Sequence, residues 1–334
     1  MRTGPLALTL GDPAGIGPEI VVKAWRALKD QGPAFFVVGD ARAVASAPTS
    51  TAGLVRPISS PTEAEGLFPT AIPVLDLPLR GPVVAGQPSP AAAPAIIQWI
   101  ETAAGLALSK TVSGVVTAPI AKAPLYAAGF KFPGHTEFLG ELTAAASYDG
   151  ARGPIMMLTA ADLRVTLVTV HEPLAQVSGK LDIQAVVNAG LVTAQALRRD
   201  FGIDRPRLAV AGLNPHAGES GSIGREEVEI VEPAIRALKD LGVDARGPYP
   251  SDTLFPAEVR ATYDAALCLY HDQALIPIKM LDFWGGVNVT LGLPIVRTSP
   301  DHGTAFDIAG RGIARPDSLI AAIRLADEIA RRRP

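Results

Sequence analysis

Cysteine is almost absent from this chain of 334 residues, which contains one, Cys268. A single thiol cannot form an intrachain disulfide, and it cannot supply the clustered ligands of a cysteine-based zinc site. A reducing compartment, the cytoplasm, is therefore the expected location. The apolar run from Pro5 to Leu10 is too short for the core of a signal peptide, so we expect no export.

The chain also lacks an excess of either charge. Thirty Lys and Arg residues stand against 33 Asp and Glu, for a net charge of −3. No basic run resembles the footprint of a protein that binds a phosphate backbone, so nucleic acid is not an expected partner. The longest uncharged stretch, 81–100, is interrupted by Pro82, Pro88, Pro90 and Pro94. It is interpreted as a loop entering a helix, and no membrane contact is expected.

Familiar nucleotide and metal motifs are missing as well. The chain has no GxGxxG fingerprint, no Walker A sequence and no HExxH. An ordinary Rossmann dinucleotide site is therefore not expected. The sequence GDPAGIGPE, at 11–19, does place a glycine-rich turn between a strand and a helix N-terminus, where free backbone N–H groups favour anions. Close packing alone is the alternative explanation for these glycines.

Hydrophobic residues, at 48%, are plentiful enough for a buried core. Short β-branched runs alternate with segments of helical spacing, which is typical of parallel strands joined by crossover helices. The predicted fold class is α/β, and the length favours two α/β/α lobes with a cleft. The expected strands are 6–10, 35–38, 114–117, 155–158, 165–170, 208–213, 266–270, 287–290 and 295–298. The expected helices are about 20–29, 95–108, 183–199, 226–241 and 318–331. The Pro/Ala/Ser-rich stretch 45–94 is expected to carry variable loops and no chemistry.

Histidines mark a candidate metal site. Of five histidines, His171, His216 and His271 each follow a predicted strand. Ligands of open α/β sheets bind beyond the carboxyl ends of the strands, so these imidazoles are expected to converge. Three neutral imidazoles suit zinc or a neighbouring ion and leave an open position, as in a catalytic site. The alternative is that each histidine caps its own strand. Asp272 adjoins His271 as an orienting group or a direct ligand.

Other polar residues indicate an anion site. Lys279, Asn288 and Arg297 follow the strand that precedes His271, where they could bind a phosphate or carboxylate jointly. Ordinary surface cations are the alternative. His135 and Thr136 stand in the sequence GHTEF, ahead of a helical segment, as ligand contacts or as a simple helix cap.

Six distinctive segments are spread over nearly the whole chain: LTLGDPAGIGPEI, TAPIAKAPLYAAGFKFPGHTEFL, LNPHAGESGSIGREE, YPSDTLF, YHDQALIPIKML and DHGTAFDIAGRGIA. Together they resemble the 4-hydroxythreonine-4-phosphate dehydrogenase family of pyridoxal 5′-phosphate (vitamin B6) biosynthesis. The resemblance implies a homodimer whose active site is shared across the interface. His171 of one subunit, with His216 and His271 of its partner, would bind a divalent metal, zinc first, with magnesium, cobalt or manganese as alternatives. The residues implied to contact a phosphorylated substrate are His135, Thr136, Lys279, Asn288 and Arg297.

The sequence DHGTAFDIAGRGIARP also resembles the NAD loop of the isocitrate and isopropylmalate dehydrogenases, whose fold the family shares. This implies NAD, with NADP left open, near His302, Gly303, Thr304 and Ala305. We expect one lobe to combine 1–130 with 295–334 and to carry this loop. The other lobe, 131–294, would hold the metal histidines and the dimer interface.

The implied reaction is oxidation of 4-phosphooxy-L-threonine to a 3-oxo acid, followed by decarboxylation to 3-amino-2-oxopropyl phosphate. Two residues are candidates for proton transfer: Lys279, and Asp252 of the SDT segment. Alternatives within the family are dehydrogenases for 4-phospho-D-threonate, 4-phospho-erythronate or a cis-dihydrodiol carboxylate. A non-catalytic phosphometabolite-binding protein is a more distant alternative.

Overall fold

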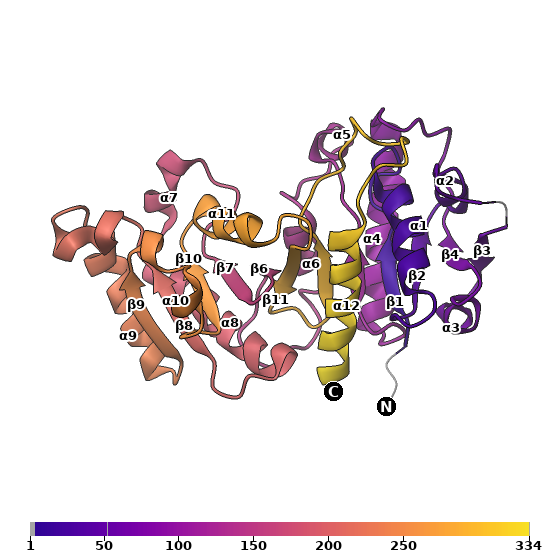
Figure 1. Ribbon diagram of the computed structural model, residues 1–334. Helices are drawn as coiled ribbons and strands as arrows, with labels where there is room; N and C mark the ends of the chain where they lie inside the picture. The colour runs from indigo at the N-terminus through magenta and orange to yellow at the C-terminus, as the bar shows by residue number, and fades with distance from the viewer. Residues whose placement is uncertain (1–3, 52, 334) are drawn as a thin grey trace. The chain divides into compact units, whose positions relative to one another are not determined.

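The structure, a computed structural model, describes residues 4–51 and 53–333. The chain divides into two compact units. Unit 1 combines the chain up to Ser147 with Pro294–Arg332, and unit 2 holds Tyr148–Leu293 with Arg333. In Figure 1, unit 1 accordingly contains both the indigo start of the chain and the yellow helix α12 (Asp317–Arg332).

The first division lies after residue 147, whereas the sequence prediction had placed it at 130. The reason is α6 (His135–Leu142), which packs against α4 (Ala93–Leu108) of unit 1. The ring of Phe138 in α6 also meets that of Phe130 edge-to-face and packs against that of Phe132, at centroid distances of 5.0 and 5.1 Å. His135 and Thr136 therefore belong to unit 1.

Unit 1 is built on a parallel sheet with the strand order β3-β4-β2-β1-β5-β12. Its central strands are continuous apolar runs buried on both faces, as expected for a parallel sheet covered by helices. The strands are β1 (Leu6–Thr9), β2 (Phe35–Gly39), β3 (Val55–Ile58), β4 (Ile72–Asp76), β5 (Val115–Thr117) and β12 (Arg297–Pro300). The remaining helices of this unit are α1 (Gly17–Leu28), α2 (Ala41–Ala45), α3 (Ala64–Leu67) and α5 (Lys122–Ala127).

Unit 2 has a mixed sheet with the strand order β11-β6-β7-β10-β8-β9. Strand β6 pairs antiparallel with β11 and β7, and the other pairs are parallel. The strands are β6 (Ile155–Ala160), β7 (Leu163–Leu167), β8 (Arg207–Ala211), β9 (Asp244–Tyr249), β10 (Ala265–Cys268) and β11 (Val287–Leu291). The helices are α7 (Leu174–Lys180), α8 (Ile183–Phe201), α9 (Glu232–Asp240), α10 (Ala257–Arg260) and α11 (His271–Leu281). Cys268 lies in this core, where burial raises the pKa of its thiol, so it is a packing residue.

The predicted α/β class with two units is confirmed, and each predicted strand has a counterpart. Strands β3, β4 and β9 were not predicted. The first two lie in the stretch 45–94, so the expectation that this stretch carries only loops is wrong. Pro57 in β3 and Pro73 in β4 concealed them, because proline inside a short run argues against a strand.

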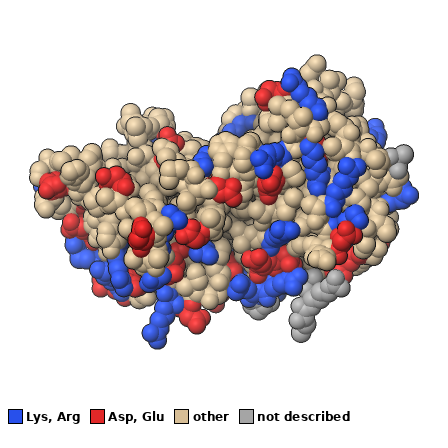
Figure 2. All heavy atoms as spheres, viewed as in Figure 1, with Lys and Arg blue, Asp and Glu red and all other residues tan. Residues whose placement is uncertain are grey.

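The stretch Pro90–Leu108 is long and apolar enough, by length and composition, to cross a membrane. In the structure, however, α4 packs against β1, β2 and β5, and Ile96, Trp99 and Ile100 are buried. It is therefore a core helix of unit 1. On the face shown in Figure 2, positive and negative side chains are interspersed.

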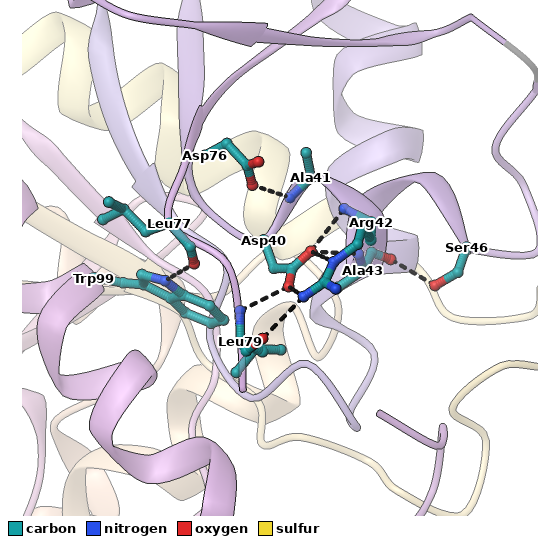
Figure 3. A network of polar contacts seen from close by, with 9 residues as sticks. All are labelled: Asp40, Ala41, Arg42, Ala43, Ser46, Asp76, Leu77, Leu79 and Trp99. Carbon is teal, nitrogen blue, oxygen red and sulfur yellow. Dashed lines mark hydrogen bonds and ion pairs between the residues drawn. The ribbon is translucent and has the colours of Figure 1, made fainter. Parts of the chain in front are cut away.

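A buried carboxylate anchors the segment that connects β4 to α4 (Figure 3). Asp40 accepts hydrogen bonds from the backbone N–H of Leu79 at 2.8 Å and from the guanidinium of Arg42 at 2.6 Å. Two residues earlier, the carbonyl of Leu77 accepts from Trp99 Nε1 at 3.0 Å. Burial alone would raise the pKa of Asp40, but the hydrogen bonds from Arg42 and Leu79 outweigh it and hold the pKa below its ordinary value.

We predict that Asp40→Asn lowers the free energy of unfolding by about 2 kcal/mol near neutral pH, because a charged, multiply bonded acceptor is lost. A carboxyl with a depressed folded-state pKa stabilises above its unfolded pKa, ordinarily 3.8, and loses that effect as the pH falls through the folded value. The difference in the free energy of unfolding between Asp40→Asn and the parent, measured by urea titration, should therefore become smaller at acidic pH. Asp76→Asn is the control, since exposed Asp76 accepts from Ala41 N and Asn can do the same. Equal effects of the two substitutions would contradict this account.

Candidate active site

In unit 2, His171 and His271 lie together. Strands β7 and β10 are parallel neighbours, so their carboxyl ends meet, and these two histidines follow those ends. Their ring centroids are 5.9 Å apart. His271 Nδ1 lies 2.7 Å from Asp272 Oδ1. A carboxylate in this position accepts from an Nδ1–H group, and the tautomer that carries this proton leaves Nε2 as the ring nitrogen that can bind a metal.

This pair lines a pocket of about 440 Å³ in unit 2, together with apolar residues such as Val170, Leu174 and Val177. An imidazole pair with a carboxylate behind one ring, beside an apolar wall, suits a metal ion with room for a small ligand. The expected convergence is therefore present for two of the three histidines.

His216 stands apart from this pair. It follows β8, which pairs with β10, but its ring is 70% exposed and its Nδ1 lies 3.3 Å from Glu219 Oε2. Within residues 4–51 and 53–333, no group of three His, Cys, Asp or Glu side chains is placed to hold a metal. The resemblance implied that His216 and His271 come from one subunit, whereas the two rings that one chain brings together are those of His171 and His271.

The backbone that carries His216 is left-handed. Every residue of 216–221 has positive φ, between 43° and 93°, and only Gly218 and Gly221 among them are glycines. Such a conformation costs a residue with a side chain about 1–2 kcal/mol, so consecutive cases need strong local support. That support comes from Glu227, which is buried and accepts hydrogen bonds from the backbone N–H groups of Leu213 and Asn214 at 2.8 and 2.7 Å.

Gln273 ties together the strand ends that carry the histidines. Its Oε1 accepts from Leu269 N at 2.6 Å, at the end of β10. Its Nε2 donates to the carbonyl of Gly212, just beyond β8, and to Ser251 Oγ, both at 2.7 Å. One buried amide therefore fixes β10, β8 and the turn Ser251–Thr253.

The other predicted residues of unit 2 are more scattered. Asp252 is exposed in the turn Ser251–Thr253. Lys279 is half-buried on α11, and its Nζ lies 5.2 Å from the ring centroid of Phe283. Asn288 lies on β11, and its buried Oδ1 has no hydrogen-bond partner among the described residues. An orphaned buried acceptor is a polar contact available to a ligand.

In unit 1, Arg297 is buried and its Nη2 donates to Thr117 Oγ1 at 2.7 Å. Burial lowers the pKa of this guanidinium to about 10, and the charge of Glu137 offsets part of the effect. Burial and then the charge of Arg297 lower the pKa of His135 well below its usual value. Among the residues that the structure describes, His135 Nε2 is buried without a hydrogen-bond partner, and Thr136 is buried next to it. A buried guanidinium, a neutral imidazole and a helix N-terminus together suit a phosphate group.

The predicted cofactor residues lie in the loop between β12 and α12. The carbonyl of Thr304 accepts from Ile16 N at 2.9 Å, and a Cβ on Gly15 would lie 2.8 Å from the same oxygen. Ala305 has a φ of 43°, and His302 Nδ1 lies 3.0 Å from the carbonyl oxygen of Gly303. The two glycine-rich segments of the sequence therefore pack directly on each other in unit 1.

A salt bridge on α1 holds the far end of this loop. Glu19 accepts from the N–H groups of Gly312 and Ala314 at 3.1 and 2.7 Å. Lys23 donates to the carbonyls of the same two residues at 2.9 and 2.6 Å, and to Glu19 at 2.7 Å. Together, Glu19 and Lys23 therefore provide hydrogen-bond partners for the backbone N–H and C=O groups of both Gly312 and Ala314.

A pocket of about 170 Å³ adjoins the glycine-rich turn. Asp12 and Ala14 line it with residues between Leu79 and Ala92, and the predicted cofactor residues do not. Burial raises the pKa of Asp12, whose Oδ1 accepts from Ala14 N at 3.0 Å. Part of the stretch 45–94 thus lines a pocket in unit 1.

Comparison with known proteins fits this geometry. The family profile described as pyridoxal phosphate biosynthetic protein PdxA matches residues 31–326. The chain belongs to the PdxA family. A 4-hydroxythreonine-4-phosphate dehydrogenase of Caulobacter vibrioides is 68% identical over 333 residues, covering 100% of this chain and 99% of its own length.

Solved structures show the same likeness. A 4-hydroxythreonine-4-phosphate dehydrogenase from Klebsiella pneumoniae matches with a TM-score of 0.85 and 41% identity, covering 98% of this chain and 99% of its own. A terephthalate 1,2-cis-dihydrodiol dehydrogenase from Burkholderia xenovorans matches with a TM-score of 0.64 and 30% identity, covering 98% of each chain. The expectations of the family and of an oxidoreductase acting on a CH–OH group are therefore confirmed.

The sequence prediction for this PdxA-family chain missed Glu227 and Gln273. Gln273 did carry a signal, because it shares the helical face of Ala274, Pro277 and Ile278, all of which are buried. A polar residue on an apolar face is either a buried hydrogen-bonding group or an error in the pattern. Glu227 carried no such signal, because it stands in a charged run.

We predict that Gln273→Met lowers the free energy of unfolding by about 2 kcal/mol, since Leu269 N would lose its acceptor and Gly212 O would keep only the hydrogen bond from Ser251 Oγ at 3.1 Å. Chemical denaturation followed by circular dichroism measures this change. Gln176→Met on α7 is the matched control, because Gln176 is exposed, and its effect should stay within about 0.5 kcal/mol. If Gln273→Met were as stable as the parent, the hydrogen bonds of the Gln273 side chain would not be needed for stability.

Proposed function

We propose that this PdxA-family chain catalyses the NAD-linked, metal-dependent oxidation of 4-phosphooxy-L-threonine in vitamin B6 biosynthesis, in the cytoplasm. The 3-oxo acid would then lose CO2 to give 3-amino-2-oxopropyl phosphate. The observation that carries the proposal is the His171–His271 pair at adjoining strand ends, with a centroid distance of 5.9 Å, in a pocket of unit 2. The relatives at 68% and 41% identity are 4-hydroxythreonine-4-phosphate dehydrogenases, which supports the substrate.

The donor set fits a divalent metal, zinc first, with magnesium, cobalt and manganese as alternatives. His171, His271 and His216 would hold it, and Asp272 fixes the tautomer of His271. When bound, such an ion supplies Lewis-acid polarisation of a substrate oxygen. The chain's own part is to present neutral imidazoles in fixed orientations and to exclude water with the apolar wall of the pocket.

Arg297, His135 and Thr136 support a phosphorylated substrate. The guanidinium of Arg297 is buried, so its charge is poorly screened and acts strongly on a phosphate dianion. The lowered pKa of His135 keeps its imidazole neutral, and a neutral ring can both donate and accept. In unit 2, Lys279 and Asn288 are the further proposed substrate residues.

We propose Lys279 and Asp252 as the two candidates for proton transfer. For the cofactor, we propose NAD, with NADP open, beside His302, Gly303, Thr304 and Ala305. The rigid attachment of this loop to Ile16, Glu19 and Lys23 supports a binding role, because it fixes backbone groups before the ligand arrives.

A homodimer with a shared site would complete the ligand set. One face of α11 and the residues after it are apolar and exposed: Ile276 is 66% exposed, Met280 75% and Phe283 59%. Leu174 on α7, beside the histidine pocket, is 73% exposed. Large apolar side chains gathered near a candidate site are typical of an interface, and a second copy of this chain is the proposed partner.

The dihydrodiol dehydrogenase at 30% identity makes oxidation of a cis-dihydrodiol carboxylate the second candidate function. We therefore predict NAD reduction with 4-phosphooxy-L-threonine, loss of activity on chelation and recovery with zinc. The same assay with 4-phospho-D-threonate, 4-phospho-erythronate and a dihydrodiol carboxylate separates the candidates. Exclusive turnover of one of the other substrates would replace the proposed substrate, and substrate binding without any turnover would favour a binding protein.

Mixing inactive variants tests how the histidines are shared. If His171 and His271 of one chain meet His216 of the other, His171→Ala mixed with His216→Ala should recover about a quarter of the parental activity. Random pairing makes about half of the dimers mixed, and each mixed dimer holds one intact site. His171→Ala mixed with His271→Ala should recover none. Recovery in both mixtures would instead support the division that the resemblance implied, because His171 then comes from one chain and both His216 and His271 come from the other.

A further inference from the structure

The left-handed turn 216–221 has no role in the hydrophobic core. His216, Glu219 and Ser220 are exposed, and their φ values of 55°, 43° and 55° are unfavourable for residues with side chains. Unfavourable backbone persists only where its surroundings determine it, and it concentrates at functional sites. Among the side chains that this turn exposes, the imidazole of His216 is the one suited to bind a metal as a neutral ligand.

The buried side chain of Glu227 determines the shape of this turn. One carboxylate oxygen, Oε1, accepts from the N–H groups of Leu213 and Asn214, and the other, Oε2, accepts from Asn214 Nδ2 at 2.9 Å. A Cβ on Gly218 would lie 2.6 Å from Glu227 Oε2, and a Cβ on Gly224 would lie 2.4 Å from Asn214 Nδ2. The carboxylate therefore contacts the entrance and the middle of the turn, and Asn214 packs against its exit.

The position of Glu227 makes this support rigid. It begins the helical segment Glu227–Val231, is 1% exposed, and follows the turn within a few residues. The neighbouring Glu226 Oε2 accepts from Asn214 Nδ2 at 2.8 Å, so the Asn214 amide is held by two carboxylates. A side chain with this many fixed partners has little freedom, and the same holds for the backbone it binds.

We infer that Glu227 is a positioning residue that fixes His216 in the orientation needed to bind the metal. The inference rests on the proposed function, because it takes His216 to be a ligand. Groups that orient a metal ligand typically account for about 10–100-fold in metal affinity. Glu227 acts through the backbone of the turn and touches neither metal nor substrate.

The test is a cobalt(II) titration of the metal-stripped full-length protein, followed by the visible absorption of the bound ion. Glu227→Gln keeps the size of the side chain but loses the charge and one acceptor. We expect it to weaken cobalt affinity about 10–100-fold and to change the spectrum, with the circular dichroism unchanged. Glu229→Gln is the matched control, because Glu229 is exposed and pairs with Arg225, and it should bind cobalt as the parent does.

His216→Ala separates the inference from the proposed function. If His216→Ala weakens cobalt binding but Glu227→Gln matches the parent in affinity and spectrum, the positioning role is wrong and the proposed metal site stands. If His216→Ala itself matches the parent, both fail. Should Glu227→Gln not fold, Asn214→Ala removes the side-chain bond and leaves the backbone bonds, and it must weaken affinity in the same direction. Parental affinity of a folded Asn214→Ala would then overturn the inference.

Discussion

The parallel pairing of β10 with both β7 and β8 is the constraint on which the candidate metal site depends. Ala266 lies opposite Val165 on one side and Ala209 on the other, so the strands end at one edge of the sheet. Side chains alternate between the two faces of a strand, and a slip of one residue would reverse every face. The apolar residues buried in this core therefore fix the register. The register in turn sets where the strands end, and so where the segments that carry His171, His216 and His271 begin.

Register alone does not orient the histidines beyond the strand ends. The peptide groups there have left the sheet, and their polar groups need other partners. Gln273 supplies them at β10 and β8, and Glu227 supplies them at the turn of His216. Both are buried and fully engaged, and neither is a candidate for chemistry. The site thus depends as much on polar groups that hold backbone as on the imidazoles themselves.

Apart from β3, β4 and β9, the sequence was sufficient to predict the class and the strands, because these follow from local apolar runs. The rule that parallel strands end together also led it to expect His171 and His271 at neighbouring strand ends. The sequence could not predict the left-handed turn. His216, Ala217 and Ser220 have no intrinsic preference for positive φ, and the conformation exists because a carboxylate eleven or fewer positions away is buried beneath them. The interpretation of Arg297 stayed open for a similar reason, since burial of a cation depends on tertiary packing, and the structure shows it buried.

The division of the chain has a consequence for synthesis on the ribosome. Unit 2 is essentially one continuous stretch, Tyr148–Leu293, whereas unit 1 needs Pro294–Arg332 for its strand β12 and helix α12. Strand β12, which pairs with β5, is synthesised only after all of unit 2. The edge of β5 therefore stays unpaired until then. Unpaired edges invite association with other chains. The unit that holds Arg297 is therefore the last to become complete, although its first strands are made before any part of unit 2.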